Sequence, residues 1–262
     1  MKDRIDIEVI NHVADVRLIR TDKMNALDDA MFDALLEAGE HLRERNDVRA
    51  IVISGEGRAF CAGLDLGNFE AMANGTRNFD LAERTHGPAN SAQFAVLQWR
   101  QMPVPVIGAI HGVAFGGGFQ LAMGPDIRIA HPDTKLSIME IKWGLVPDMG
   151  GMLLLRDLVR PDVAGELTYT GRMFSGTEAR DMGLVTAVND DPHAEAMSLA
   201  REIAEKNPDA IRAAKRLLSI CDDTIVGRVL AAEASEQEKL VSSPNQIEAV
   251  RAAQERRVAN FT

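Results

Sequence analysis

The feature that most constrains the fold of this chain is a short, almost wholly apolar run at Val104–Ile110 that leads directly into a glycine-rich turn. A continuous apolar run of this length is typical of a strand buried on both faces of a sheet. A short helix near Phe119–Met123 and a strand at Asp126–Ala130 are expected to follow. Earlier in the chain, apolar spacing predicts a helix over Asp29–Arg45 and a strand over Arg49–Ser54. This alternation predicts an α/β core.

The two ends of the chain differ in character. Alternating apolar residues predict a hairpin at the N-terminus that turns at Asn11, and Asp28 is placed to cap the first helix. After Pro192 the sequence is rich in Ala, Glu and Arg, and its spacing predicts four successive helices with no strand. We therefore expect a core over residues 1–192 and a helical region over residues 193–262.

Composition and charge argue against several classes of protein. The 262 residues are 46% hydrophobic and 26% charged, which is typical of a folded globular chain. The net charge of −10 argues against a nucleic acid partner, because phosphate backbones attract basic surfaces. The two cysteines lie far apart and the histidines show no paired spacing, so no metal site is expected. Without a signal sequence or an 18-residue apolar run, the chain is expected to be cytoplasmic and to have no membrane partner.

Two glycine-containing turns, each after an expected buried strand, are the first candidates for a functional site. One is Ala62–Asp65, and the other contains Gly116–Gly118 at the start of a helix. Consecutive glycines let the backbone approach a ligand and leave unpaired N–H groups at a helix N-terminus, where negative charge is favoured. An oxyanion hole requires these properties, although a tight structural turn shows the same pattern. Nucleotide-binding, zinc-protease and serine-hydrolase motifs do not occur in the sequence.

A third segment, Met139–Gly151, places a carboxylate in apolar surroundings. Glu140 lies near its start, and Asp148 follows Pro147 eight positions later. Removal from water raises the pKa of a carboxyl group towards the range that suits a catalytic base. The alternatives are a solvated strand end for Glu140 and a turn or helix cap for Asp148.

These three segments occur together and in order, and the chain resembles the crotonase superfamily of enoyl-CoA hydratases and isomerases over nearly its whole length. Ala62–Asp65 resembles the family's A-G-x-D turn, and Gly116–Gly118 resembles its G-G-G turn. Arg20–Leu27 resembles its R-P-x-x-x-N-A-L segment, with Thr21 in place of proline. The resemblance implies a spiral of ββα units, a C-terminal helical region that mediates oligomerisation, and a homotrimer or hexamer.

The resemblance also implies roles for individual residues. The backbone N–H groups of Leu64 and Gly117 are expected to hold the thioester oxygen of an acyl-CoA substrate. Coenzyme A enters as part of that substrate, and no separate cofactor is expected. Arg20 and Lys23 are expected to meet the CoA phosphates. Three further residues are expected beside the CoA: Ala26, Ala62 and Asp65.

One position departs from the pattern of the family's hydratases, which carry two glutamates. The first falls three residues beyond the middle glycine, where this chain has Gln120, and the second matches Glu140. A glutamine can hold a water molecule but cannot exchange a proton at neutral pH. A single carboxylate at the Glu140 position serves the family's Δ3-Δ2 enoyl-CoA isomerases, and Asp148 matches an aspartate of its dienoyl-CoA isomerases.

We therefore expect an enoyl-CoA hydratase/isomerase family enzyme that stabilises a thioester enolate, with Glu140, Gln120 and Asp148 as its catalytic residues. Double-bond isomerisation is the favoured reaction. The alternatives are a true hydratase, in which Gln120 and Glu140 jointly position water, and a CoA-binding protein with a vestigial site. The acyl group accepted depends on four aromatic residues and one polar segment: Phe69, Trp99, Phe119, Trp143 and residues 72–84.

Overall fold

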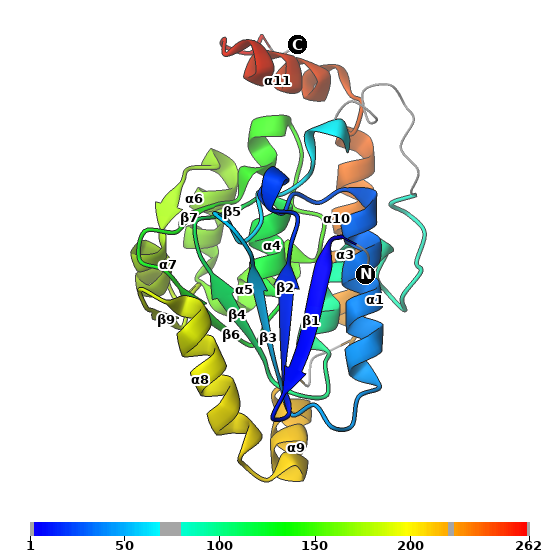
Figure 1. Cartoon of the computed structure of the whole chain (residues 1–262). Coiled ribbons are helices and arrows are strands. Elements are labelled where there is room, and N and C mark those ends of the chain that lie inside the picture. Colours follow the sequence, from blue (N-terminus) through cyan, green and yellow to red (C-terminus); the bar gives the residue numbers. More distant parts are fainter. Residues whose placement is uncertain (1–2, 69–79, 220–222, 261–262) are drawn as a thin grey trace.

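The computed structural model describes residues 3–68, 80–219 and 223–260, which form two sheets surrounded by helices (Figure 1). The larger sheet has the strand order β1-β2-β3-β4-β6-β9, with β1 antiparallel to β2 and the other pairs parallel. Its strands are β1 (Ile5–Ile10), β2 (Val13–Leu18), β3 (Ala50–Gly55), β4 (Val106–Ile110), β6 (Ile127–Ala130) and β9 (Ala187–Val188). The smaller sheet consists of β5 (Val113–Phe115), β7 (Lys135–Ser137) and β8 (Phe174–Ser175).

The second half of the core passes repeatedly between the two sheets. β4 belongs to the larger sheet and β5 to the smaller one, and α4 (Gly117–Met123) follows before β6 returns to the larger sheet. β7 and β8 again extend the smaller sheet, and α7 (Gly176–Met182) leads to β9. The predicted α/β class is confirmed. The spiral of ββα units and the oligomerising role of the C-terminal region stay predictions.

Helices cover both faces of the larger sheet at its centre, which explains why the central strands β3 and β4 are almost wholly apolar. Helices α1 (Asp29–Arg43) and α3 (Ser91–Arg100) belong to the main core, together with Ile51 and Ile53 of β3. The neighbouring Val52 points the other way and packs with α8 (Pro192–Ala204). Figure 1 shows α1 and α8 on opposite sides of this sheet. Because successive side chains of a strand alternate between faces, two covered faces require an unbroken apolar run.

The N-terminal elements follow the sequence prediction closely. The hairpin turns at Asn11 and His12, both of which adopt positive φ angles. Helix α1 begins directly after Asp28, whose carboxylate accepts a hydrogen bond from the Met31 N–H. It ends at Arg43, two residues earlier than expected.

Four helices follow residue 191, as predicted, and the described part of this region contains no strand. They are α8, α9 (Pro208–Leu218), α10 (Asp223–Leu240) and α11 (Pro244–Glu255). α10 contacts α5 (Gly151–Leu158), and α11 contacts the short helix η2 (Met139–Trp143). Much of the helical region therefore packs onto its own chain, and the division at residue 192 stays a prediction.

The remaining elements are η1 (Thr21–Lys23) and α6 (Pro161–Thr170). Among the described helices, none combines the length and the apolar character that crossing a membrane requires.

Candidate active site

The two glycine turns lie side by side and are joined through their backbones. Cys61 and Ala114 form a parallel bridge, and the Phe115 N–H donates to the Cys61 carbonyl oxygen over 3.2 Å. A Cβ atom on Gly118 would lie only 2.2 Å from that carbonyl oxygen. A Cβ atom on Gly63, which has a φ of +89°, would lie 2.4 Å from the Phe115 oxygen. The turns can approach this closely only because both positions are glycine.

The approach brings two unpaired donors to one cavity. A Cβ atom built on Gly63 would lie 3.6 Å from the Gly117 nitrogen, so the second turn starts beside the first. Within the described part of the chain, neither the Leu64 N–H nor the Gly117 N–H has a hydrogen-bond partner. Leu64 and Gly117 both line the cavity. Two unpaired N–H groups at one wall can donate hydrogen bonds to an anionic oxygen, which is the arrangement predicted for the oxyanion hole.

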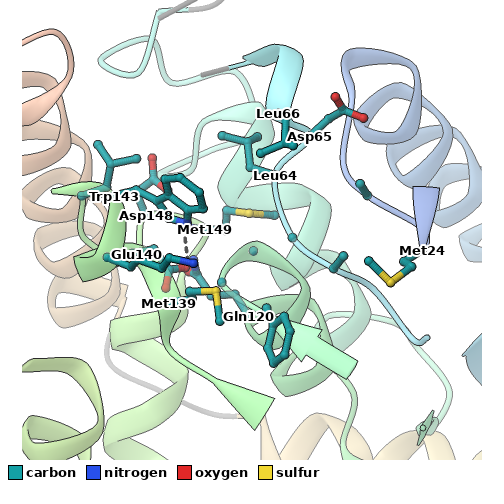
Figure 2. Close-up of a pocket in the computed structure, with 18 of the residues that line it drawn as sticks. Met24, Leu64, Asp65, Leu66, Gln120, Met139, Glu140, Trp143, Asp148 and Met149 are labelled. Atoms are coloured by element: carbon teal, nitrogen blue, oxygen red, sulfur yellow. Dashed lines mark hydrogen bonds between the residues drawn. The ribbon is translucent and has the colours of Figure 1, made fainter. Parts of the chain in front are cut away.

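The cavity has a volume of about 620 Å³ and lies between the two turns, η1, η2 and the segment that precedes α5. Its apolar wall is rich in flexible side chains. In Figure 2, Trp143 and Asp148 lie beside Glu140 and Gln120, and Leu64 comes from the opposite turn. Sulfur-containing side chains and other large apolar groups complete the lining: Met24, Met139, Met149, Met173, Phe32 and Leu145.

Glu140 projects from η2 into this cavity and is 8% exposed. Its Oε1 accepts a hydrogen bond of 2.6 Å from the Gln120 Nε2, whereas its Oε2 has no partner among the described residues. Burial raises the pKa of Glu140 to about 7, and the nearby Asp148 carboxyl contributes to this shift. The carboxyl is therefore poised to gain or lose a proton near neutral pH.

The Gln120 amide has one possible orientation. Its Oε1 accepts hydrogen bonds from the Met149 N–H at 2.9 Å and from the Gly151 N–H at 3.0 Å. The amide NH₂ group must then face Glu140, since only the oxygen can accept from the two backbone donors. Gln120 thus acts as a fixed donor to Glu140.

Asp148 also lines the cavity, between η2 and α5. Burial raises its pKa to about 7, against a hydrogen bond with Gln237 that lowers it. The Gln237 Oε1 accepts from the Val146 N–H over 3.1 Å, which leaves the Gln237 NH₂ group for the Asp148 carboxyl. The alternative role as a helix cap is not observed, because α5 is capped at Gly150 without a side-chain hydrogen bond.

The residues predicted to contact CoA divide into two groups. Lys23, Ala26, Ala62 and Asp65 line the cavity, whereas Arg20 is not on its wall. The Arg20 guanidinium lies behind the wall, where it donates to the Asp65 carboxylate at 2.6 Å and to the Ala26 oxygen at 3.0 Å. It also lies 3.4 Å from Asp28, so two carboxylates already neutralise it. Of the two predicted phosphate-binding cations, Lys23 lies at the cavity and Arg20 supports its wall.

Some lining residues were not predicted from the sequence. Lys142 provides a second cation at the cavity, and Gln237 reaches it from α10. Gln237 and the buried Glu233 lie one helical turn apart on the face of α10 that buries Leu230. A sequence signal for Gln237 and Glu233 does exist: both are polar residues at core-facing positions of an amphipathic helix, where a buried polar side chain needs a hydrogen-bond partner.

The aromatic residues expected to shape the acyl site do not all lie at the cavity. Trp143 lines the cavity. Trp99 and Phe119 are fully buried in the main core, away from the cavity wall. Phe69 and most of the polar segment at residues 72–84 lie outside the described residues.

An α/β fold with paired glycine turns and a buried glutamate at one cavity defines a protein of the crotonase class. The sequence model of the Enoyl-CoA hydratase/isomerase family matches residues 8–262, and the chain belongs to this family. It is 32% identical to the mouse mitochondrial Delta(3,5)-Delta(2,4)-dienoyl-CoA isomerase, over 94% of this chain and 77% of that protein. It is 36% identical to a probable enoyl-CoA hydratase of Bacillus subtilis, over 82% of this chain and 81% of that protein.

The fold is shared with solved members of the same family. The crystal structure of an enoyl-CoA hydratase/isomerase from Mycobacterium paratuberculosis superposes with a TM-score of 0.85 at 27% identity. The similarity covers 96% of this chain and 98% of that one. The relatives thus include both hydratases and isomerases, and the choice of reaction depends on the side chains of the site.

Proposed function

We propose that the protein isomerises a carbon–carbon double bond of an enoyl-CoA through a thioester enolate, with Glu140 as the base. The observation that supports this proposal is the fixed Gln120 amide. Its oxygen accepts from two backbone N–H groups and its NH₂ group donates to Glu140. Position 120 therefore supplies no proton carrier, and Glu140 retains the proton-transfer role alone at this side of the cavity.

In the proposed reaction the thioester oxygen of a 3-enoyl-CoA lies between the Leu64 and Gly117 N–H groups. The unpartnered Oε2 of Glu140 removes a proton from C2, and the electron pair of the C–H bond forms the enolate, whose oxygen the two donors stabilise. The protonated Glu140 then returns the proton to C4. The C3–C4 double bond moves to C2–C3, and the thioester carbonyl is restored. The pKa of about 7 suits both steps, since Glu140 acts first as base and then as acid.

Asp148 favours a second candidate, the isomerisation of a 3,5-dienoyl-CoA. It places a second carboxyl group with a pKa of about 7 on the same cavity. The similarity to a mouse dienoyl-CoA isomerase extends over nearly the whole chain. In that reaction one carboxyl removes the C2 proton and the other delivers a proton to the far end of the extended dienolate.

The test is a screen of the purified protein against 3-enoyl-, 3,5-dienoyl-, 2-enoyl- and 3-hydroxyacyl-CoA esters in D₂O. Products are identified by mass and by the positions of deuterium. We expect conversion of 3-enoyl-CoA to 2-enoyl-CoA, with deuterium at C4 in those turnovers in which the protonated Glu140 exchanges with D₂O before it returns the proton. Efficient hydration of 2-enoyl-CoA would assign a hydratase instead. Binding of these esters with no turnover would identify a CoA-binding protein with a vestigial site.

Two variants then distinguish the carboxyl groups. Glu140→Gln is expected to lower kcat by about 10²- to 10⁴-fold, as is usual when acid–base catalysis is lost. Acyl-CoA affinity should stay nearly unchanged, because this side chain meets the acyl carbons and not the nucleotide. Asp148→Asn is the matched comparison and should have the smaller effect on 3-enoyl-CoA. If Asp148→Asn abolishes turnover while Glu140→Gln does not, the assignment of Glu140 as the single base is wrong.

A further inference from the structure

Helix α10 carries a buried carboxylate that the proposed chemistry does not use. Glu233 is 5% exposed, and its two oxygens bind the first turn of α5. Its Oε2 accepts from the Gly150 N–H at 2.9 Å, and its Oε1 accepts from the Met152 N–H at 3.0 Å. The N-terminus of a helix leaves such donors unpaired and favours a negative charge.

Glu233 and Gln120 share four consecutive N–H groups of this segment. Gln120, on α4, accepts from Met149 and Gly151, whereas Glu233 accepts from the alternate positions, Gly150 and Met152. Two side chains from two different helices thus hold the start of α5 through alternate N–H groups. The orientation of the Gln120 amide depends on the position of Met149 and Gly151, and Glu233 holds the residues next to them, Gly150 and Met152.

One helical turn further along α10, Gln237 holds the preceding part of the segment. Its Oε1 accepts from the Val146 N–H, and its amide hydrogen-bonds with the Asp148 carboxyl. Gln93 of α3 fixes Glu233 in turn, since its Nε2 donates to the Leu230 oxygen at 2.8 Å and lies 3.3 Å from the Glu233 Oε2. The polar face of α10 is therefore held by hydrogen bonds to α3 and to the segment around the start of α5.

We propose that Glu233 is a positioning residue of the active site. It fixes Gly150 and Met152, and through them it holds the Gln120 amide against Glu140, while Gln237 holds Asp148 on the cavity. This inference rests on the proposed function and extends it, because it makes a residue of the C-terminal helical region necessary for the geometry of the proton transfer. Glu233 itself contacts neither substrate nor reacting atoms, since it is not on the cavity wall.

The test is the Glu233→Gln variant, which keeps the size of the side chain but replaces one acceptor oxygen with an NH₂ group. One of the two bound N–H groups then faces a donor, so the start of α5 must shift. We expect kcat for 3-enoyl-CoA to fall by about 10- to 100-fold, the effect of a displacement on the order of 1 Å at a site of proton transfer. Acyl-CoA affinity, followed through tryptophan fluorescence because Trp143 lines the cavity, should change less than about threefold, since the oxyanion donors and Lys23 are untouched.

Glu236→Gln is the matched control. It removes the same charge from the same helix, but Glu236 is exposed and pairs with Lys239. Its kcat should equal that of the wild type. Glu233→Asp, which keeps both acceptor oxygens on a shorter side chain, should recover part of the lost kcat. A role in folding alone would lower the unfolding temperature without this split between kcat and affinity.

Hydrogen exchange gives a readout that does not require turnover. In Glu233→Gln the amides of residues 149–152 should exchange faster than in the wild type, with the strands of the larger sheet unchanged. Wild-type kcat together with wild-type exchange in this variant would overturn the inference. If Glu233→Gln does not fold, Gln237→Leu tests the same face of α10. An unchanged kcat in Gln237→Leu would then overturn the inference. A wild-type protein that neither binds nor converts acyl-CoA would contradict the proposed function, while exchange at residues 149–152 still decides the role of Glu233.

Discussion

At the scale of single residues, the site is built around one glutamate whose surroundings favour its neutral form. The Glu140 carboxyl is buried, receives one hydrogen bond from Gln120 and leaves its other oxygen unpartnered among the described residues. A carboxylate that a protein stabilises for structure alone usually has a cation or several donors. Glu140 therefore destabilises the folded chain when it ionises, which is a property of a reactive group.

The destabilisation of the folded chain by ionised Glu140 predicts how the free energy of unfolding depends on pH. The pKa of Glu140 rises from 4.5 to about 7 on folding, so between these values the unfolded chain has released a proton that the folded chain keeps. The contribution of Glu140 to the free energy of unfolding therefore falls as pH rises from about 4.5 to about 7. Glu140→Gln lacks this proton, so its stability relative to wild type should increase over that interval by on the order of 1 to 3 kcal/mol. Urea unfolding at pH 5 and pH 8 measures the difference, and a constant difference would contradict it.

A second prediction concerns the residue that departs from the hydratase pattern. In Gln120→Glu, one carboxylate oxygen takes over the hydrogen bonds from Met149 and Gly151, and the other faces Glu140 Oε1 at a distance near the present 2.6 Å. Two oxygens this close share a proton, which raises the pKa of the pair. Hydration of 2-enoyl-CoA should then appear or rise, with its optimum above neutral pH. Product analysis by mass detects it, and unchanged product ratios would contradict the prediction.

At the scale of elements, the site depends on how closely the two glycine turns approach. Gly117 and Gly118 are adjacent but differ in what a methyl group would meet. A Cβ atom on Gly117 would contact the flexible ends of Leu27 and Met149 at 2.9 Å, whereas a Cβ atom on Gly118 would collide with the backbone oxygen of Cys61. Side-chain ends can move aside, but a backbone oxygen held in a bridge cannot.

Gly118→Ala is therefore expected to separate the turns, to lower the free energy of unfolding by about 1 to 3 kcal/mol and to abolish most turnover. Gly117→Ala is the matched control and should retain fold and activity to a large extent, because the N–H remains. Gly117→Pro removes this donor at the first position of α4, where proline is tolerated, and should lose turnover with the fold intact. Thermal unfolding and kcat of the three variants check this, and near-normal turnover by folded Gly117→Pro would remove Gly117 from the site.

At the scale of the whole molecule, the C-terminal helices have two different environments. Leu230 of α10 is fully buried by its own chain, so it leaves no apolar surface for a partner. Leu217 and Leu218, at the end of α9, are 69% and 84% exposed. Exposed leucines on a strongly amphipathic helix indicate an interaction surface.

We predict that the protein is a homotrimer or a hexamer in solution and that α9 contributes to the contacts between subunits. Sedimentation at micromolar concentration should give three or six times the chain mass of 28.6 kDa. Leu217→Glu combined with Leu218→Glu should shift this towards smaller species without unfolding the chain, because neither side chain packs in the core. Ile211 lies on the same helix but is partly buried, so it stays unchanged in this variant. A wild-type monomer would contradict the prediction.

The sequence by itself determined the α/β class, the buried strands, the four C-terminal helices and the two glycine turns, because these depend on local spacing of apolar residues and on backbone freedom at glycine. The resemblance to the crotonase family singled out Gln120, Glu140 and Asp148 as candidate catalytic residues. Only the tertiary structure decided what these groups can do. The orientation of the Gln120 amide, the placement of Arg20 behind the wall and the hold of Glu233 on α5 each depend on a partner distant in sequence. Hydrogen bonds between distant residues and the burial that shifts a pKa have no local pattern in a chain, since both arise from packing.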